Sequence, residues 1–190
     1  MSDEGEQAAL PPEAQTVLDF WYVECDAEQW FKKNAAFDAT IRTRFATLHD
    51  QACAGALDGW AATPRGCLAL ILILDQFSRN LFRDDGRAFA FDQKTVDLVR
   101  QALARDDDRT LAEKERMFLY MPLMHSEDLD DQRLCVDKMS DFDDDGPHDF
   151  AKRHLEIIER FGRFPHRNAV LGRASTDEEE LFLQQPGSSF

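Results

Sequence analysis

The stretch that decides the fold is TPRGCLALILILDQFSRNLFR, residues 63–83. Thr63 can cap a helix, and Pro64 suits the first turn, where its missing N–H costs no hydrogen bond. Every side chain from Leu68 to Leu74 is apolar, so this half of the helix has no polar face for solvent. We therefore expect it to be the central helix of an all-helical core.

The second half of the same stretch becomes polar. At 100° per residue, Asp75, Arg79 and Arg83 continue the line of apolar residues, and Asn80 lies beside them. A helix that is surrounded by neighbours in its first half should stay partly covered in its second. The sequence therefore predicts a charged cluster at the edge of the core.

Composition bounds the class of protein. The chain has 190 residues, of which 43% are hydrophobic, with 15 Phe and 3 Trp, enough for one globular core. Its formal net charge of −15 would repel a phosphate backbone, so we expect neither nucleic acid nor an anionic membrane as a partner.

The four cysteines form no C-x-x-C pair, so they indicate neither a zinc site nor a disulfide scaffold. We find no motif for a cofactor and expect none. The N-terminus has no apolar signal segment, and the longest apolar run is too short to cross a bilayer. These observations predict a cytoplasmic protein.

Apolar residues recur at helical spacing along the rest of the chain, and no segment alternates as a strand would. We expect an all-α fold of about eight helices, arranged as stacked antiparallel pairs. Residues 1–11 would form a flexible acidic leader, and residues 12–190 a single domain. The expected helices, capping residues included, span residues 12–24, 36–53, 63–83, 88–105, 111–125, 126–139, 147–161 and 176–184.

Four residues predict how particular helices begin and end. Pro122 should kink its helix or end it early, because it removes the hydrogen-bond partner of a carbonyl one turn back. Ser126 is a candidate cap for the helix that follows. Gly162 is a candidate C-cap, and Thr176, three residues before a glutamate, predicts a capping box.

Five segments together resemble a known family, the uncharacterised bacterial domain of unknown function 924. They are LDFWY (18–22), LILDQFSRNLFR (72–83), FLYMPLMHSED (118–128), RFGRFPHRNAVLGR (160–173) and PGSSF (186–190). The resemblance implies a tetratricopeptide-repeat-like all-α fold and brings no activity, substrate or catalytic residue. Ser78 stands where many relatives are expected to have proline, which we interpret as a detail at a helix end.

The first candidate site is the polar end of the central helix, Asp75, Arg79, Asn80 and Arg83. Arg79 and Arg83 lie one turn apart and repel each other unless an anion sits between them. Asp92, placed on the apolar face of its helix, could supply that charge from within, and a ligand carboxylate or phosphate could supply it from outside. The alternative is an ion-pair network that only braces helices.

The second candidate is the segment that begins at His125. A histidine followed by Glu127 invites an acid–base interpretation, with both as catalytic residues. The alternative for Ser126 and Asp128 is a plain helix start, which favours these residue types.

The third candidate is the irregular loop 163–173, rich in arginine. Its side-chain donors suit geometric recognition of an anion, or else clamp the loop onto acidic helix ends. The residues concerned are Arg163, His166, Arg167, Asn168 and Arg173.

His154 lies within an apolar stripe and is more often a hydrogen-bonded core histidine than a ligand. A metal site built from it with His125, Glu127 and His166 has no recognised ligand spacing, so we expect no metal.

These candidates support three hypotheses. The leading one is a binding protein for an anionic small molecule or peptide carboxylate in an Arg/His-rich pocket. The anion would be held by Arg79, Arg83, Arg163 and Arg167, and these arginines would be oriented by Asp75, Asn80 and Asp92. The second is a hydrolase or lyase acting on an anionic substrate, with His125 or His166 as the acid–base group and Glu127 orienting it. The third is a structural adaptor that binds proteins by its outer face.

A separate hypothesis concerns the last five residues. The carboxylate of Phe190 could dock near an arginine of its own or a neighbouring molecule, although most chain ends fray.

Overall fold

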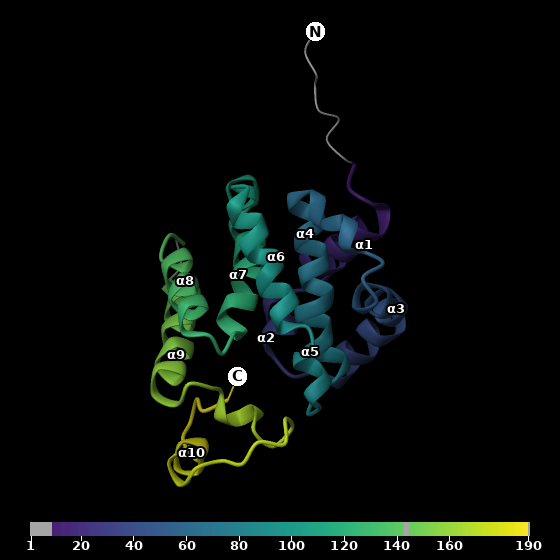
Figure 1. Ribbon diagram of the computed structural model, residues 1–190. Coiled ribbons are helices and arrows are strands. Elements are labelled where there is room, and N and C mark those ends of the chain that lie inside the picture. Colours follow the sequence, from purple (N-terminus) through teal and green to yellow (C-terminus); the bar gives the residue numbers. More distant parts are fainter. Residues whose placement is uncertain (1–8, 143–144, 190) are drawn as a thin grey trace.

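The computed structural model describes residues 9–142 and 145–189, and this part of the chain is all-α, without a strand (Figure 1). Residues 1–8 of the expected leader and the hypothesis on Phe190 lie outside the described residues. The helices are α1 (Pro12–Asp19), α2 (Ala27–Phe31), α3 (Ala35–Cys53), α4 (Pro64–Ile71), α5 (Ser78–Leu81), α6 (Asp92–Ala104), α7 (Glu113–His125), α8 (Leu129–Met139), α9 (Asp145–Phe161) and α10 (Asp177–Leu183).

The predicted central helix is confirmed. α4, a π-helical segment (Leu72–Phe77) and α5 follow one another with helical backbone angles at both junctions. Thr63 caps the N-terminus, because its hydroxyl accepts a hydrogen bond from the N–H of Gly66. Every side chain from Leu68 to Leu74 is buried among α1, α3, α6 and α7 (Figure 1).

A second π-helical segment, Phe20–Glu24, continues α1. The two π segments meet in the core, where the ring of Phe77 lies 6.0 Å from Phe20 and 5.7 Å from Trp21. π-helical turns are rare and often mark functional sites. Of the two π segments among the described residues, Phe20–Glu24 overlaps the LDFWY motif and Leu72–Phe77 lies within LILDQFSRNLFR.

Ser78 lies inside the central helix, so its interpretation as a helix-end detail is wrong. Its hydroxyl donates to the carbonyl of Leu74 at 2.6 Å and contacts Nε2 of the buried His49 at 2.8 Å. A proline at this position could offer neither contact.

Helices α6 to α9 follow one another side by side, each packed on the next (Figure 1). Short connections between neighbouring helices make them antiparallel. This part of the molecule matches the expected stacking of helix pairs, whereas a relation to tetratricopeptide repeats stays a prediction. None of the described helices is long and apolar enough to cross a membrane.

The start of α6 and the effect of Pro122 differ from the prediction. α6 begins at Asp92, because a 3-10 turn (Gly86–Phe89) capped by Asp85 takes up the residues before it. α7 passes Pro122 and continues to His125, so the helix does not end early.

Asp128, and not Ser126, caps α8. Its carboxylate accepts the N–H groups of Asp130 and Asp131, while the Ser126 hydroxyl donates to the side chain of Asp131 at 2.7 Å. The two predicted features near the C-terminus are confirmed: Gly162 has a φ of +67°, and Thr176 forms a capping box with Glu179.

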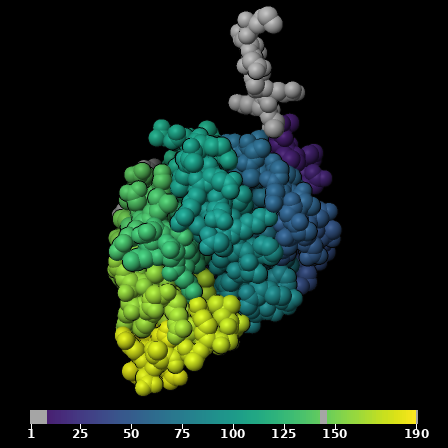
Figure 2. Space-filling model, in the orientation of Figure 1, coloured from purple at the N-terminus to yellow at the C-terminus, as the bar shows by residue number. Residues whose placement is uncertain are grey.

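The C-terminal segment packs around a small apolar cluster that is separate from the main core. Ile157, Ile158 and Phe164 are buried together, with Phe161 and Phe182 packed against them. The segment then turns back toward the end of the central helix: a Cβ on Gly86 would lie only 2.9 Å from the carbonyl oxygen of Val170. Figure 2 shows this yellow segment seated against the teal surface of the earlier helices.

Candidate functional site

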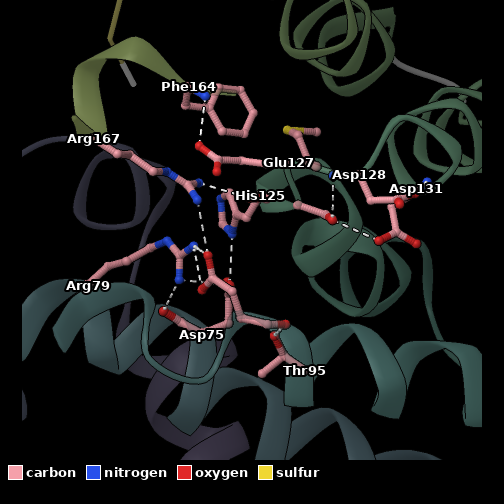
Figure 3. A network of polar contacts seen from close by, with 12 residues as sticks. Asp75, Arg79, Thr95, His125, Glu127, Asp128, Asp131, Phe164 and Arg167 are labelled. Carbon is pink, nitrogen blue, oxygen red and sulfur yellow. Dashed lines mark hydrogen bonds and ion pairs between the residues drawn. The ribbon is translucent and has the colours of Figure 1, made fainter. Parts of the chain in front are cut away.

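Four parts of the chain meet beside the polar end of the central helix. The π segment and α5 bring Asp75 and Arg79, α6 brings Asp92, α7 brings His125, and the 3-10 turn Pro165–Arg167 brings Arg167. We call these five residues the Arg–Asp–His cluster. Figure 3 shows the side chains of Arg79, Arg167 and His125 converging above Asp75.

Asp75 is the buried centre of the cluster. Its carboxylate accepts hydrogen bonds from Nδ1 of His125 at 2.8 Å and Nε2 of Gln76 at 2.6 Å. Nη1 of Arg79 forms an ion pair with it at 2.9 Å and donates a hydrogen bond to the backbone carbonyl of Asp75 at 3.0 Å. Burial alone would raise the pKa of Asp75, but Arg79 and the hydrogen-bonded neighbours outweigh it and hold the pKa well below its usual range. Asp75 is therefore an anion at every physiological pH.

His125 is held as a neutral imidazole. Burial and the nearby Arg79 lower its pKa, and they outweigh the opposing effect of Asp75. The proton of the neutral ring then sits on Nδ1, where it is donated to Asp75, and Nε2 keeps its lone pair. The side chain is 16% exposed, and Nε2 makes no hydrogen bond to the part of the chain that the structure describes.

Arg79 and Arg167 share the carboxylate of Asp92. Nη2 of Arg79 lies 3.0 and 3.1 Å from its two oxygens, and Nη1 of Arg167 lies 3.2 Å from one of them. Both guanidinium groups also lie over the ring of Phe89, at 5.6 and 4.5 Å from its centroid. Two cations thus share the carboxylate of Asp92, and Arg79 is also paired with Asp75.

Arg167 is the most enclosed cation of the cluster, with a side chain 7% exposed. Burial, followed by repulsion from Arg79, lowers its pKa to about 10. Nη2 donates to the backbone carbonyl of His125 at 2.9 Å, whereas the buried Nε has no partner among the described residues.

Arg83 and Asn80 belong to a different contact. Both bind Asp38 of α3, with Arg83 Nη2 and Asn80 Nδ2 each 2.8 Å from the same carboxylate oxygen. The structure therefore separates Arg83 from Arg79, and the expected sharing of one anion by these two is corrected. The physical reason is that Asp38, distant in sequence, already neutralises Arg83.

Glu127 also departs from its expected role. Its carboxylate pairs with Arg173 at 2.7 and 2.9 Å and accepts the backbone N–H of Phe164 at 2.8 Å. Asp75 is the acid that orients His125, so the expectation that Glu127 does so is wrong.

The remaining loop residues brace α10. Arg163 forms two hydrogen bonds to Glu179 at 2.6 and 2.7 Å, and Asn168 reaches the same carboxylate at 3.3 Å. Asn168 also accepts from Nε of Arg173 at 3.0 Å. The hydrogen bond from Arg163 is the main reason why the pKa of Glu179 falls to about 2. These contacts fit the alternative of a loop clamped onto an acidic helix end.

His154 and His166 lie on the ring of Phe164, each with a centroid distance of 5.6 Å. His154 Nδ1 contacts the carbonyl of Phe150 at 2.8 Å, as expected of a core histidine. Burial lowers the pKa of His154 to about 3 and that of His166 to about 4. In the described part of the chain, no three His, Cys, Asp or Glu side chains are placed to hold a metal ion.

Four participants in these contacts were missed from the sequence. Asp38, Phe89 and Glu179 face the predicted arginines from other parts of the fold, and the backbone N–H of Phe164 meets Glu127. Only Glu179 had a local signal, its capping box with Thr176, and that signal concerns a helix start.

The fold and the cluster define a class: an all-α protein with a largely buried Arg–Asp–His network at the end of its central helix. Residues 17–187 match the model of the family described as bacterial protein of unknown function (DUF924), and the chain belongs to this family. A solved structure titled as the protein of unknown function ATU0120 from Agrobacterium tumefaciens is 38% identical to this chain. The match covers 90% of this chain and 97% of that one, with a TM-score of 0.86. No curated protein matches.

Proposed function

We propose that this protein binds a small anionic molecule or a peptide carboxylate at the Arg–Asp–His cluster, with Arg79 and Arg167 as the anion-binding pair. The observation that carries the proposal is the sharing of Asp92 by these two arginines. Like charges held close together repel, and a ligand anion would relieve this repulsion.

Each arginine has a donor without a partner among the described residues, and that of Arg79 lies on the more exposed side chain. A guanidinium has five N–H groups in a planar fork that matches a carboxylate or phosphate. Nε of Arg79 makes no hydrogen bond to the described residues, and Nε of Arg167 is buried without one. The side chains of Arg79, Asp92 and His125 are 16–19% exposed, so a small anion can approach the cluster from this side.

Arg83 and Arg163 are not part of the proposed pair, because Asp38 and Glu179 neutralise them. The expectations that the protein is cytoplasmic, forms a single domain and avoids nucleic acid stay predictions beside this proposal.

The test is a thermal-shift and calorimetric titration at low ionic strength with inorganic phosphate, succinate and a short peptide with a free carboxylate. A probe at 100 times its dissociation constant should add about 2.7 kcal/mol to the free energy of unfolding. Arg79→Gln should weaken the binding of an active probe about tenfold or more, because hydrogen bonds to charged groups contribute about 1.5–3 kcal/mol.

Arg83→Gln is the matched control, since it removes an arginine one turn away that is paired with another acid. It should leave the affinity of the probe unchanged. If no probe stabilises the protein, or if Arg79→Gln binds as the wild type does, the anion-binding proposal is wrong. The cluster would then be an ion-pair network that only braces helices, the alternative stated for the first candidate site.

A further inference from the structure

We propose that His125, positioned by Asp75, is a general base that activates water for the hydrolysis of a small carboxylic ester bearing a negative charge. The inference rests on the proposed function, because Arg79 and Arg167 would hold the charged end of the substrate. It adds a reaction to what would otherwise be a binding site.

The Asp75–His125 contact has the geometry that a general base needs. A buried carboxylate that accepts from Nδ1 fixes the ring orientation and the tautomer, and it stabilises the imidazolium that forms during proton transfer. Asp75 is itself fixed by Gln76 and Arg79. The atom left over is Nε2, which carries the lone pair and lies on a partly exposed side chain.

The surroundings of His125 select water as the nucleophile. Within the described residues, no Ser, Thr or Cys side chain is hydrogen-bonded to His125. The adjacent Ser126 donates its hydroxyl to Asp131. Elsewhere among the described residues, Ser78 contacts His49, but both side chains lie in the core with exposures of 0% and 3%, where no substrate can reach them.

The neighbouring charges suit an anionic ester. Nη2 of Arg167 donates a hydrogen bond to the backbone carbonyl of His125. Arg79 and the imidazole of His125 both contact the carboxylate of Asp75. One guanidinium can bind the charged end of the substrate while the other stabilises the oxyanion of a tetrahedral intermediate. Both cations lie within one hydrogen-bonded network with the proposed base.

The reaction balances with water as its sole co-reactant. Nε2 of His125 takes a proton from water while the water oxygen bonds to the ester carbonyl carbon, and the carbonyl electron pair moves to oxygen. When this oxyanion collapses, the bond to the alcohol oxygen breaks, and that oxygen takes the proton from Nε2. The products are a carboxylic acid and an alcohol, and His125 is neutral again.

The experiment measures release of p-nitrophenol from mono-p-nitrophenyl succinate and glutarate, with p-nitrophenyl butyrate as the uncharged comparison. The wild type should prefer the charged esters. The rate should rise with pH and level off above a pKa below the usual 6.5 of histidine, as the lowered pKa of His125 requires. His125→Gln should lose about 10²–10⁴-fold in rate.

His148→Gln is the matched control, because His148 is a partly exposed histidine of α9 outside the cluster. It should retain the full rate. In His125→Ala, added imidazole should restore part of the rate, a result that a purely structural histidine would not give. Asp75→Asn should lower the rate and shift the pH profile of hydrolysis. If this variant does not fold, His125→Gln and His125→Ala still test the proposal.

The two proposals can fail separately. If succinate binds and Arg79→Gln weakens it, but the wild type hydrolyses none of the esters above the buffer rate, the catalytic inference is wrong and the binding function stands. If hydrolysis is equal in the wild type and His125→Gln, the inference is wrong as well. If neither binding nor hydrolysis is seen, both are wrong.

Discussion

At the scale of single residues, the cluster depends on one carboxylate serving two cations. Asp92 begins α6 and faces Arg79 from the central helix and Arg167 from the C-terminal segment. Its position among apolar residues on the helical wheel is explained by these two partners. Partners offset the desolvation cost of a buried charge, whereas removing one partner leaves the others uncompensated.

Asp92→Asn tests this dependence. The substitution keeps the shape of the side chain but leaves the two guanidinium groups facing each other, so the free energy of unfolding should fall by about 3 kcal/mol. Phosphate should stabilise this variant more than the wild type, because an external anion can replace the lost charge. Urea denaturation with and without phosphate measures both effects, and an equal response of the two proteins would contradict the argument.

At the scale of elements, the first turn of the central helix packs closely against the turn that precedes it in the chain. A Cβ on Gly66 would lie 2.2 Å from the backbone carbonyl oxygen of Trp60 and 2.7 Å from the hydroxyl of Thr63. Trp60 belongs to the 3-10 turn Asp58–Ala62, which leads into α4. Only glycine lets the turn and the helix meet at this distance.

Gly66→Ala should therefore destabilise the protein, even though alanine is the better helix former. Overpacking against backbone atoms costs about 1–3 kcal/mol, because these atoms cannot move aside as a flexible side chain can. Gly59→Ala is the matched control: a Cβ there would meet nothing within 4 Å. Thermal denaturation of the two variants should show a clear loss for Gly66→Ala and little change for Gly59→Ala.

At the scale of the whole molecule, the fold buries several titratable groups in their pH 7 forms. Burial keeps His154 and His166 neutral, while Asp75, Glu127 and Glu179 are held ionised by their partners. Both kinds of group bind fewer protons in the folded state than in the unfolded state, the histidines below pH 6.5 and the acids below about pH 4. Stability should therefore fall as the pH falls.

His154 should contribute to this loss over the wider pH range of the two histidines. Its pKa is about 3 in the folded protein, so below pH 6.5 the unfolded chain gains a proton that the folded chain does not. The free energy of unfolding should then drop by about 1.4 kcal/mol per pH unit from this residue alone between about pH 6 and pH 4. Urea denaturation at several pH values should give a shallower slope for His154→Gln, and identical slopes would contradict the assignment.

Much of the fold could be predicted from local patterns. Three features depend only on residues that are near one another in the sequence, so they can be predicted from it. They are the apolar run Leu68–Leu74, the cap at Thr63 and the capping box at Thr176. Some helix boundaries could not be predicted from such local patterns. The missed start of α6 depends on Asp85 and a 3-10 turn that competes with the helix for the same residues.

The residues of the candidate site could be predicted from the sequence, but which of them contact one another could not. The sequence by itself determined an all-α chain with a buried central helix whose polar end carries Asp75 and Arg79. Only the tertiary structure decided that His125, 50 residues further on, contacts Asp75, and that Arg167, 75 residues beyond Asp92, completes the cluster. Local rules reach about four residues along a helix. Which acid meets which base across such distances depends on how the helices pack.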